Sequence, residues 1–439
     1  MKTNKITIIA LVCSIVIISS SIFLCGNSKQ AQNTKVENEI NKNQQKTKKK
    51  LNRELSDEKW IEDIDYLATE LPRRHKNLFF NTTQDNFQKQ IEGLKKQIPY
   101  LNDNEIKVGF LKIVASVGDA HTNGYIKSEK LLPLKFYWFE NNIYVINTSK
   151  KYENILYNQL VSIDGTNVDE IIQGISKTIS HENSQWIKSI LPRYISVPER
   201  LHGLNIVKNT DSAIFAFKDL EGNLINIDVK SKHFDENTEW VLEENENTPL
   251  YRKNSSQHYW YEYLQDSKTL YFKYNRCRVM EDRPMDEFRI ELFNVLNENQ
   301  AERLIIDLRN NMGGDDRYLR EFIDRIFVVE KQMNHADKLF VIIGRDTFSS
   351  GVLGAMYAKE NTNATLIGES TGGKPNSYGE TNYFDLKNSQ LRVYYSTKYF
   401  KNIDEDIDSF SPDVNIEVTL KDYIENRDPV LDRILKNRK

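Results

Sequence analysis

Apolar residues recur every three or four positions in three stretches between residues 56 and 117. The three sets are Trp60, Ile61, Ile64 and Leu67; Phe87, Ile91, Leu94 and Ile98; and Phe110, Leu111, Val114 and Val117. This spacing places apolar side chains on one face of a helix. The pattern therefore predicts an N-terminal helical region over residues 56–128, in which the last helix stops at Gly118.

Between Leu131 and Val229 the period shortens towards two, which is typical of strands. Turn residues at 140–142 and 221–223 predict two hairpins, and the stretch Gln159–Ile163 is predicted to be a strand that turns at Asp164-Gly165. Residues 129–250 are therefore expected to form a strand-rich middle section.

From Thr269 onward, predicted strands and helices alternate. The strands are 269–274, 303–308, 339–343 and 364–367, and the helices are 284–296, 316–327 and 350–359. Alternation of this kind produces crossover units on one sheet. The fold class expected for residues 251–439 is therefore α/β with a crossover sheet.

The N-terminal residues form two segments of different character. Residues 1–26 begin with Lys2 and Lys5 and continue with an uncharged run, Ile6–Cys25, long enough for a membrane anchor and also compatible with an export signal. Cys25 follows Leu24 in a partial lipobox, so an exported lipoprotein is a further reading. Residues 27–55 are Lys-rich and predict a flexible linker. The folded part is expected outside the cell membrane.

Charge and cysteine content exclude some classes of protein. The net charge is −3 and the first 53 residues carry +8, so the remainder carries −11 and would repel a phosphate backbone. Nucleic acid is therefore not an expected partner. Cys277 is the one cysteine after the N-terminal run, so the folded part has no internal disulfide.

Three loops carry candidate chemistry: 119–122 after a helix, 310–314 after a strand, and 347–351 between a strand and a helix. A serine at such a strand–helix junction lies near free backbone N–H groups, which suits a nucleophile, although serine also caps helices often. Gly313 and Gly314 suit an oxyanion hole. His121 titrates near neutral pH, whereas Lys374 would need its pKa lowered by burial to act as a base.

The strings VGDAHT, LIIDLRNNMGG, TFSSG, LIGESTGGKPNSYG and SPDV occur in one order over residues 105–420. Together they resemble the tail-specific, or C-terminal-processing, serine peptidase family, which is related to tricorn protease cores. The resemblance implies a ClpP/crotonase-like serine peptidase domain that hydrolyses peptide bonds without a metal or other cofactor. Polypeptides, in extended or unfolded segments, are the implied substrates.

The resemblance also implies roles for individual residues. Ser349 matches the nucleophile, and Ser350, with the Gly313-Gly314 turn, matches the source of the oxyanion N–H groups. Lys374 lies 25 positions after Ser349, as in the Ser/Lys branch of the family.

That branch has a glutamine four residues after the lysine and an acid three after the serine, where this chain has Tyr378 and Val352. In the tricorn-like branch the base matches His121, supported by an acidic residue that counting back from Pro412 places at Asp406. His121 is the preferred base and Lys374 the alternative.

Family members often carry a PDZ domain, and the stretch 160–165 resembles one PDZ strand and turn. The alternative to a peptidase is a protein of the same fold that binds a ligand or peptide without cutting it, because fold does not determine activity. A complete set of nucleophile and base would favour the peptidase.

Overall fold

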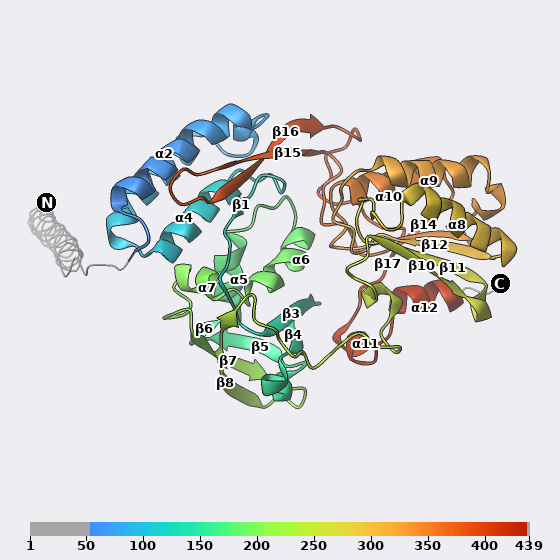
Figure 1. The fold of residues 1–439 in the computed structure, drawn as a ribbon, viewed down its shortest axis with the longest axis horizontal. Helices are drawn as coiled ribbons and strands as arrows, with labels where there is room; N and C mark the ends of the chain where they lie inside the picture. Colours follow the sequence, from blue (N-terminus) through green and yellow to red (C-terminus); the bar gives the residue numbers. More distant parts are fainter. Residues whose placement is uncertain (1–52, 437–439) are drawn as a thin grey trace, which may run out of the picture. The chain divides into compact units, whose positions relative to one another are not determined.

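The computed structural model describes residues 53–436, and residues from Glu54 onward form one compact unit (Figure 1). The predicted anchor, signal or lipidation segment, residues 1–26, lies outside the described residues, as does most of the predicted linker. Among the helices of residues 53–436, none is both long enough and apolar enough for a membrane crossing.

The predicted N-terminal helices are present. They are α2 (Asp57–Arg74), α3 (Gln84–Gln97) and α4 (Asp103–Ala115). Each is preceded by a side chain that accepts a backbone N–H of its first turn: Ser56, Thr83 and Asn102. The apolar sets read from the sequence form their shared core. The last helix ends at Ala115, three residues before the predicted stop.

A hairpin late in the sequence completes this helical region. Strands β15 (Ser377–Asp385) and β16 (Arg392–Phe400) pair with each other, and β16 also pairs with β1 (Gly124–Tyr125). Phe384 and Val393 of the hairpin are buried in the same core as the three helices, and Figure 1 shows the hairpin beside α2. The predicted boundary at residue 251 therefore needs correction, because residues 377–400 pack with the N-terminal region.

The middle section contains the predicted hairpins and three helices that were not predicted. Its main sheet has the order β3-β4-β5-β7-β8, with β6 paired to β5. The strands are β3 (Leu134–Phe139), β4 (Asn142–Thr148), β5 (Gln159–Ile163), β6 (Thr166–Asn167), β7 (Ser212–Lys218) and β8 (Leu224–Lys230). A short pair, β2 (Lys130–Leu131) and β9 (Lys232–His233), and the helices α5 (Val168–Ser176), α6 (Ser184–Tyr194) and α7 (Pro198–Gly203) complete it.

The C-terminal section is the predicted crossover sheet, with strand order β10-β11-β12-β13-β14-β17. Strands β11 to β14 and β17 run parallel, and β10 is an antiparallel edge. The strands are β10 (Tyr259–Leu264), β11 (Thr269–Tyr274), β12 (Arg303–Asp307), β13 (Leu339–Ile343), β14 (Thr365–Gly368) and β17 (Val414–Asn415). The helices are α8 (Met285–Glu298), α9 (Arg317–Val328), α10 (Ser350–Asn361), α11 (Leu420–Ile424) and α12 (Pro429–Lys436).

Both faces of this sheet are covered. Alternate residues such as Ile306 and Val341 pack against α8, α9 and α10, while their neighbours Ile305 and Phe340 pack against α12. Figure 1 shows these helices beside the sheet. This burial on both sides explains why the central strands read as continuous apolar runs. Because β11 to β14 run parallel, the loops at their carboxyl ends lie at one edge of the sheet, where ligands of such sheets bind.

Candidate active site

Ser349 occupies a strained backbone position at the start of α10. Its φ is 51° and its ψ is −125°, a combination that residues other than glycine rarely adopt and that costs about 1–3 kcal/mol. Although Ser349 holds the N-cap position, its side chain makes no capping hydrogen bond. The helix-cap interpretation of this serine is therefore wrong, and its half-buried hydroxyl is left for another role.

The neighbouring Ser350 differs in each of these respects. It is buried, and its hydroxyl donates to the carbonyl oxygen of Gly314 at 2.6 Å. A hydroxyl fixed in this way ties α10 to the 310–314 loop. Of the two serines, Ser349 is therefore the candidate nucleophile.

His121 lies next to the serine loop. Its ring contacts the ring of Phe348, with 4.5 Å between the ring centroids. The side chain is 12% exposed, and its Nδ1 is buried with no hydrogen-bond partner among the described residues. Burial lowers the pKa of His121 below its ordinary value, and the charge of Asp119 opposes this only in part. A lowered pKa favours the neutral imidazole, which is the form that a general base needs.

Asp119 is the carboxylate nearest to the His121 ring. Its Oδ1 lies 3.9 Å from Nδ1 of His121 and accepts the His121 backbone N–H at 2.9 Å. Its Oδ2 accepts the hydroxyls of Thr122 and Ser396, both at 2.6 Å, and Nε2–H of His75 at 3.1 Å. Burial alone would raise the pKa of Asp119, but these donors and His121 outweigh it and lower the pKa. The carboxylate is therefore charged and held in place.

The hydrogen bonds of His75 indicate which of its ring nitrogens donates. Its Nδ1 accepts the backbone N–H of Asn77 at 3.0 Å, so the ring proton lies on Nε2, which faces Asp119. His75 follows α2, and Ser396 belongs to β16. Residues from three distant parts of the sequence thus hold one carboxylate, and the sequence motif VGDAHT alone did not indicate this cluster.

Lys374, the alternative base, belongs to a segment that borders the serine loop, but its side chain is held in ion pairs. A Cβ atom at the adjacent Gly373 would lie 3.1 Å from the Ser349 nitrogen, so this segment borders the serine loop. The Lys374 ammonium forms ion pairs with Asp406 at 2.8 Å and Asp408 at 3.6 Å. Burial lowers the pKa of Lys374, yet these carboxylates outweigh it and the net pKa is raised. A general base needs the opposite shift.

The same ion pair changes the interpretation of Asp406. It was predicted to support His121, but among the described residues its carboxylate pairs with Lys374 and is 69% exposed. The physical reason is that the acidic run 404–406 lies in a surface loop, where a nearby ammonium is its available partner. The acid beside His121 is Asp119 instead.

The three backbone N–H groups predicted for an oxyanion hole are not equivalent. The Gly313 N–H donates to Oδ1 of Asn311 at 2.9 Å, so it is occupied and its predicted role is corrected. The N–H groups of Gly314 and Ser350 have no acceptor among the described residues. A Cβ atom at Gly313 would lie 3.0 Å from the Ser350 nitrogen, so the two loops meet at this point.

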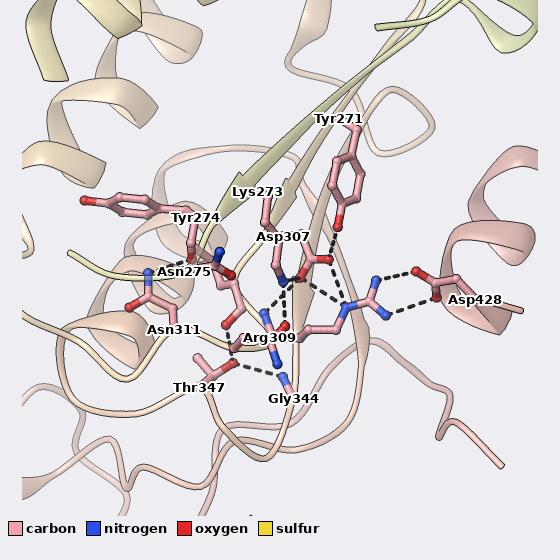
Figure 2. Close-up of polar contacts among 12 residues, drawn as sticks. Tyr271, Lys273, Tyr274, Asn275, Asp307, Arg309, Asn311, Gly344, Thr347 and Asp428 are labelled. Carbon is pink, nitrogen blue, oxygen red and sulfur yellow. Dashed lines mark hydrogen bonds and ion pairs between the residues drawn. The ribbon is translucent and has the colours of Figure 1, made fainter. Parts of the chain in front are cut away.

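A buried network of charged side chains lies at the strand ends from which these loops start (Figure 2). Asp307 at the end of β12 pairs with Lys273 at 3.1 Å and with Arg309 at 2.9 Å, and Arg309 makes two further bonds to Asp428. Thr347 ties the serine loop to the same place, because its hydroxyl donates to the Leu308 carbonyl at 2.9 Å. Sequence reasoning did not identify this network.

Glu182 is a second acidic group that the sequence did not single out. Burial first, and then the charge of Asp119, raise its pKa to about 8, and its Oε2 is buried without a partner among the described residues. The next residue, Asn183, bonds to the carbonyl oxygens of Gly372 and Asp408. The 182–183 loop thus borders the Lys374 segment.

Comparison with known families decides the class of this site. The model of peptidase family S41 matches residues 271–416, which include most of β11, all of β12 to β17 and the serine loop. The match assigns residues 271–416 of this chain to the tail-specific S41 peptidase family. S41 enzymes are serine peptidases, so the match supports a serine peptidase here.

Solved structures extend the likeness in fold beyond the matched residues. Mature CPAF is similar with a TM-score of 0.62 and 12% identity over 87% of this chain and 97% of that one, and CPAF complexed with lactacystin has a TM-score of 0.61. A putative peptidase from Parabacteroides merdae covers 86% of this chain at 14% identity, with a TM-score of 0.44. A comparison with curated protein sequences finds no match.

Proposed function

We propose that this S41 member is an active serine endopeptidase in which Ser349 is the nucleophile, His121 the general base and Asp119 the carboxylate that orients His121. The observation that carries the proposal is the Ser349 hydroxyl, which is held in a strained backbone and excluded from capping its own helix. A serine with a merely structural role, such as Ser350, has its hydroxyl engaged.

In this mechanism His121 takes the Ser349 proton as the hydroxyl oxygen attacks a peptide carbonyl. The tetrahedral intermediate collapses to an acyl-enzyme when the protonated His121 gives the proton to the leaving amine. Water then repeats the sequence and releases the acid. Asp119 stabilises the transient imidazolium, because its charged Oδ1 is already 3.9 Å from Nδ1 and no other acceptor competes for that atom among the described residues.

The developing oxyanion would be held by the N–H groups of Gly314 and Ser350. Both are free of acceptors within residues 53–436, and Ser350 is the first residue of α10, so its N–H lies at the positive end of the helix dipole. The network of Figure 2 supports this arrangement, because it fixes the strand ends from which both loops start.

For the substrate and the location, we propose extended or unfolded polypeptide segments outside the cell membrane, with residues 1–26 as the tether. The apolar run Ile6–Cys25 and the Lys-rich linker support this location. Protease treatment of intact cells tests it. Loss of the folded part without cell lysis is the expected result, and full protection would contradict it.

Hydrolysis of a fluorescently labelled unfolded protein tests the proposed activity, with Ser349→Ala and Ser350→Ala compared. We expect Ser349→Ala to lower kcat on the order of 10⁶-fold. Ser350→Ala keeps the nucleophile and loses one hydrogen bond, so we expect a loss of less than about tenfold. A folded wild-type protein that cleaves nothing, and in which neither variant changes any signal, would instead support a non-catalytic binding protein of the same fold.

A further inference from the structure

Asn311, in the loop that follows β12, is fully buried and has hydrogen bonds at both ends of its side-chain amide. Its Nδ2 donates to the carbonyl oxygen of Tyr274 at the end of β11, at 2.9 Å, and Figure 2 shows this bond. Its Oδ1 accepts the backbone N–H of Gly313 at 2.9 Å and the thiol of Cys277 at 3.4 Å. The amide thus joins the strand next to β12 to the turn formed by Gly313 and Gly314.

Both of these backbone bonds depend on the amide group. The Tyr274 oxygen needs a donor and the Gly313 N–H needs an acceptor, and the asparagine side chain supplies one of each. A carboxylate has no donor, and an aliphatic side chain of similar size has neither group. Because Asn311 is 0% exposed, its removal would leave both backbone groups buried without a partner.

The main chain of Asn311 connects the same turn to the serine loop. Its N–H donates to the Leu308 carbonyl oxygen at 2.9 Å, and its carbonyl oxygen accepts the Phe348 N–H at 2.9 Å. Phe348 directly precedes Ser349. A Cβ atom at Gly351 would lie 2.5 Å from the Asn311 carbonyl oxygen, so the first turn of α10 packs on this residue as well. Asn311 therefore lies where the two loops of the candidate site meet.

The hydrogen bonds of the glycine turn determine the direction of the Gly314 N–H. The C=O and N–H of a trans peptide group point in opposite directions, and the Gly313 carbonyl oxygen accepts the Cys277 N–H at 3.0 Å. The Gly314 N–H belongs to the same peptide group, so it points away from Cys277. Two successive glycines permit many turn conformations, and here φ is 98° at Gly313 and 136° at Gly314. The bond from the Gly313 N–H to Asn311 selects this conformation.

We propose that Asn311 is a positioning residue for the oxyanion hole: it holds the Gly313 N–H and thereby directs the Gly314 N–H, beside that of Ser350, at the developing oxyanion. Its kinetic effect rests on the proposed peptidase activity, whereas its effect on the turn does not require catalysis. The Asn311 side chain is buried with both ends engaged, so it acts through Gly314 and not on the substrate.

Hydrolysis of a labelled unfolded protein by the full chain tests the kinetic effect. Asn311→Ala removes both amide bonds, and we expect kcat to fall about 10²–10³-fold, as when one oxyanion donor is lost, with KM changed less than about threefold. Asn311→Ser retains an acceptor that reaches the N–H two residues on, although more weakly, so its kcat should be at least tenfold above that of Asn311→Ala.

Asn147→Ala is the matched control. Asn147 in β4 is also buried, at 8% exposed, and its amide bonds to both the carbonyl oxygen and the N–H of Leu242 at 2.8 and 3.0 Å. Its replacement removes the same kind of bonds from the middle section. We expect it to lower stability while leaving kcat within about threefold of the wild-type value. Equal values of kcat in folded Asn147→Ala and Asn311→Ala would overturn the proposal.

Nuclear magnetic resonance tests the turn without catalysis. The chain contains two Gly-Gly pairs, 313–314 and 372–373. When glycine carries ¹³C at the carbonyl and ¹⁵N at the amide, an HNCO spectrum of the full chain therefore has two signals, from the Gly314 and Gly373 amides. Gly313→Ala removes the first and so assigns it. In Asn311→Ala we expect the Gly314 signal to shift or broaden and the Gly373 signal to stay, because the Gly373 N–H has its own acceptor, the Thr347 carbonyl oxygen.

The two readouts separate this proposal from the proposed peptidase activity. An unchanged Gly314 signal in folded Asn311→Ala would overturn the role of Asn311, whatever the kinetics. If Asn311→Ala does not fold, Asn311→Ser gives the same comparison, with a smaller shift of the Gly314 signal expected and an unchanged signal contradicting the proposal. A shifted Gly314 signal in a chain whose wild-type form cleaves nothing would refute the peptidase and support the role of Asn311 in the turn.

Discussion

His121 and Lys374 lie in segments that border the serine loop, and their contacts with nearby carboxylates differ. His121 is buried beside Asp119, whose oxygens accept hydrogen bonds from three other side chains and from the His121 backbone N–H. The His121 ring forms no short ion pair with this carboxylate, and burial lowers the pKa of His121. Lys374 lies at the border of a surface loop, where Asp406 and Asp408 bind its ammonium directly and raise its pKa.

The difference shows which surroundings allow a basic side chain to act as a general base. A close exposed ion pair stabilises the proton on nitrogen, whereas a buried carboxylate that is fixed by other donors leaves the imidazole neutral and still stabilises the imidazolium once it forms. Both residues lie in segments that border the serine loop, so the environment of each nitrogen decides between them.

Replacing His121 and Lys374 in turn should give the largest difference in kcat/KM. His121→Ala should lower kcat/KM by a factor on the order of 10⁴ or more, because the nucleophile loses its proton acceptor. Lys374→Ala should lower it less than about tenfold. The measurement is hydrolysis of the labelled unfolded protein at pH 7, with the fold of each variant checked by circular dichroism. The reverse order of effects would show that Lys374 is the base.

Asp119→Asn tests whether the buried carboxylate stabilises the protonated His121. We expect kcat to fall about 10²–10⁴-fold, because the imidazolium loses its stabilising charge while the side chain keeps its shape. Asp406→Asn is the matched control, and its kcat should change less than about threefold. A large loss in Asp406→Asn with little change in Asp119→Asn would restore the role that sequence counting assigned to Asp406.

The same two carboxylates should differ in their effect on stability. Asp119→Ala leaves the His75 Nε2–H and two hydroxyls buried without their acceptor, and we expect it to lower the free energy of unfolding by about 3 kcal/mol or more. Asp406→Ala removes one exposed ion pair and should cost less than about 1 kcal/mol. Urea unfolding at pH 7 measures both, and equal costs would contradict the contrast.

The pH dependence of kcat/KM gives the smallest effect. The base works when neutral, so the rate should be full at pH 7 and fall as pH decreases through the lowered pKa of His121, which lies below the ordinary value of about 6.5. Because Asp119 raises the pKa of His121, Asp119→Asn should move this acid limb to still lower pH. A limb above pH 8 would indicate a lysine base.

The central sheet was predictable because its sequence signal is local. Strands β11 and β13 have the predicted bounds, since each is an apolar run that ends at polar loop residues. The hairpin β15–β16 was missed because its apolar residues are buried by helices some 300 residues earlier in the chain. Its own pattern mixes tyrosines with polar residues, which gives a weak strand signal.

The site was predictable to a similar extent. The motifs indicated Ser349 and His121, and the structure places their two loops next to each other. The proposed acid partner could not be read in this way, because Asp119 is held by His75 and Ser396 from other regions, and no spacing rule connects these positions. The availability of the Ser349 hydroxyl likewise depends on a backbone angle that sequence does not show.

Labelling of the full chain with a fluorophosphonate probe, mapped by peptide mass spectrometry, tests the central claim most directly. The account predicts stoichiometric modification at Ser349 in the wild-type protein and in Lys374→Ala, and loss of modification in His121→Ala. Modification at Ser350, modification that depends on Lys374 rather than His121, or no modification of a folded wild-type protein would contradict it.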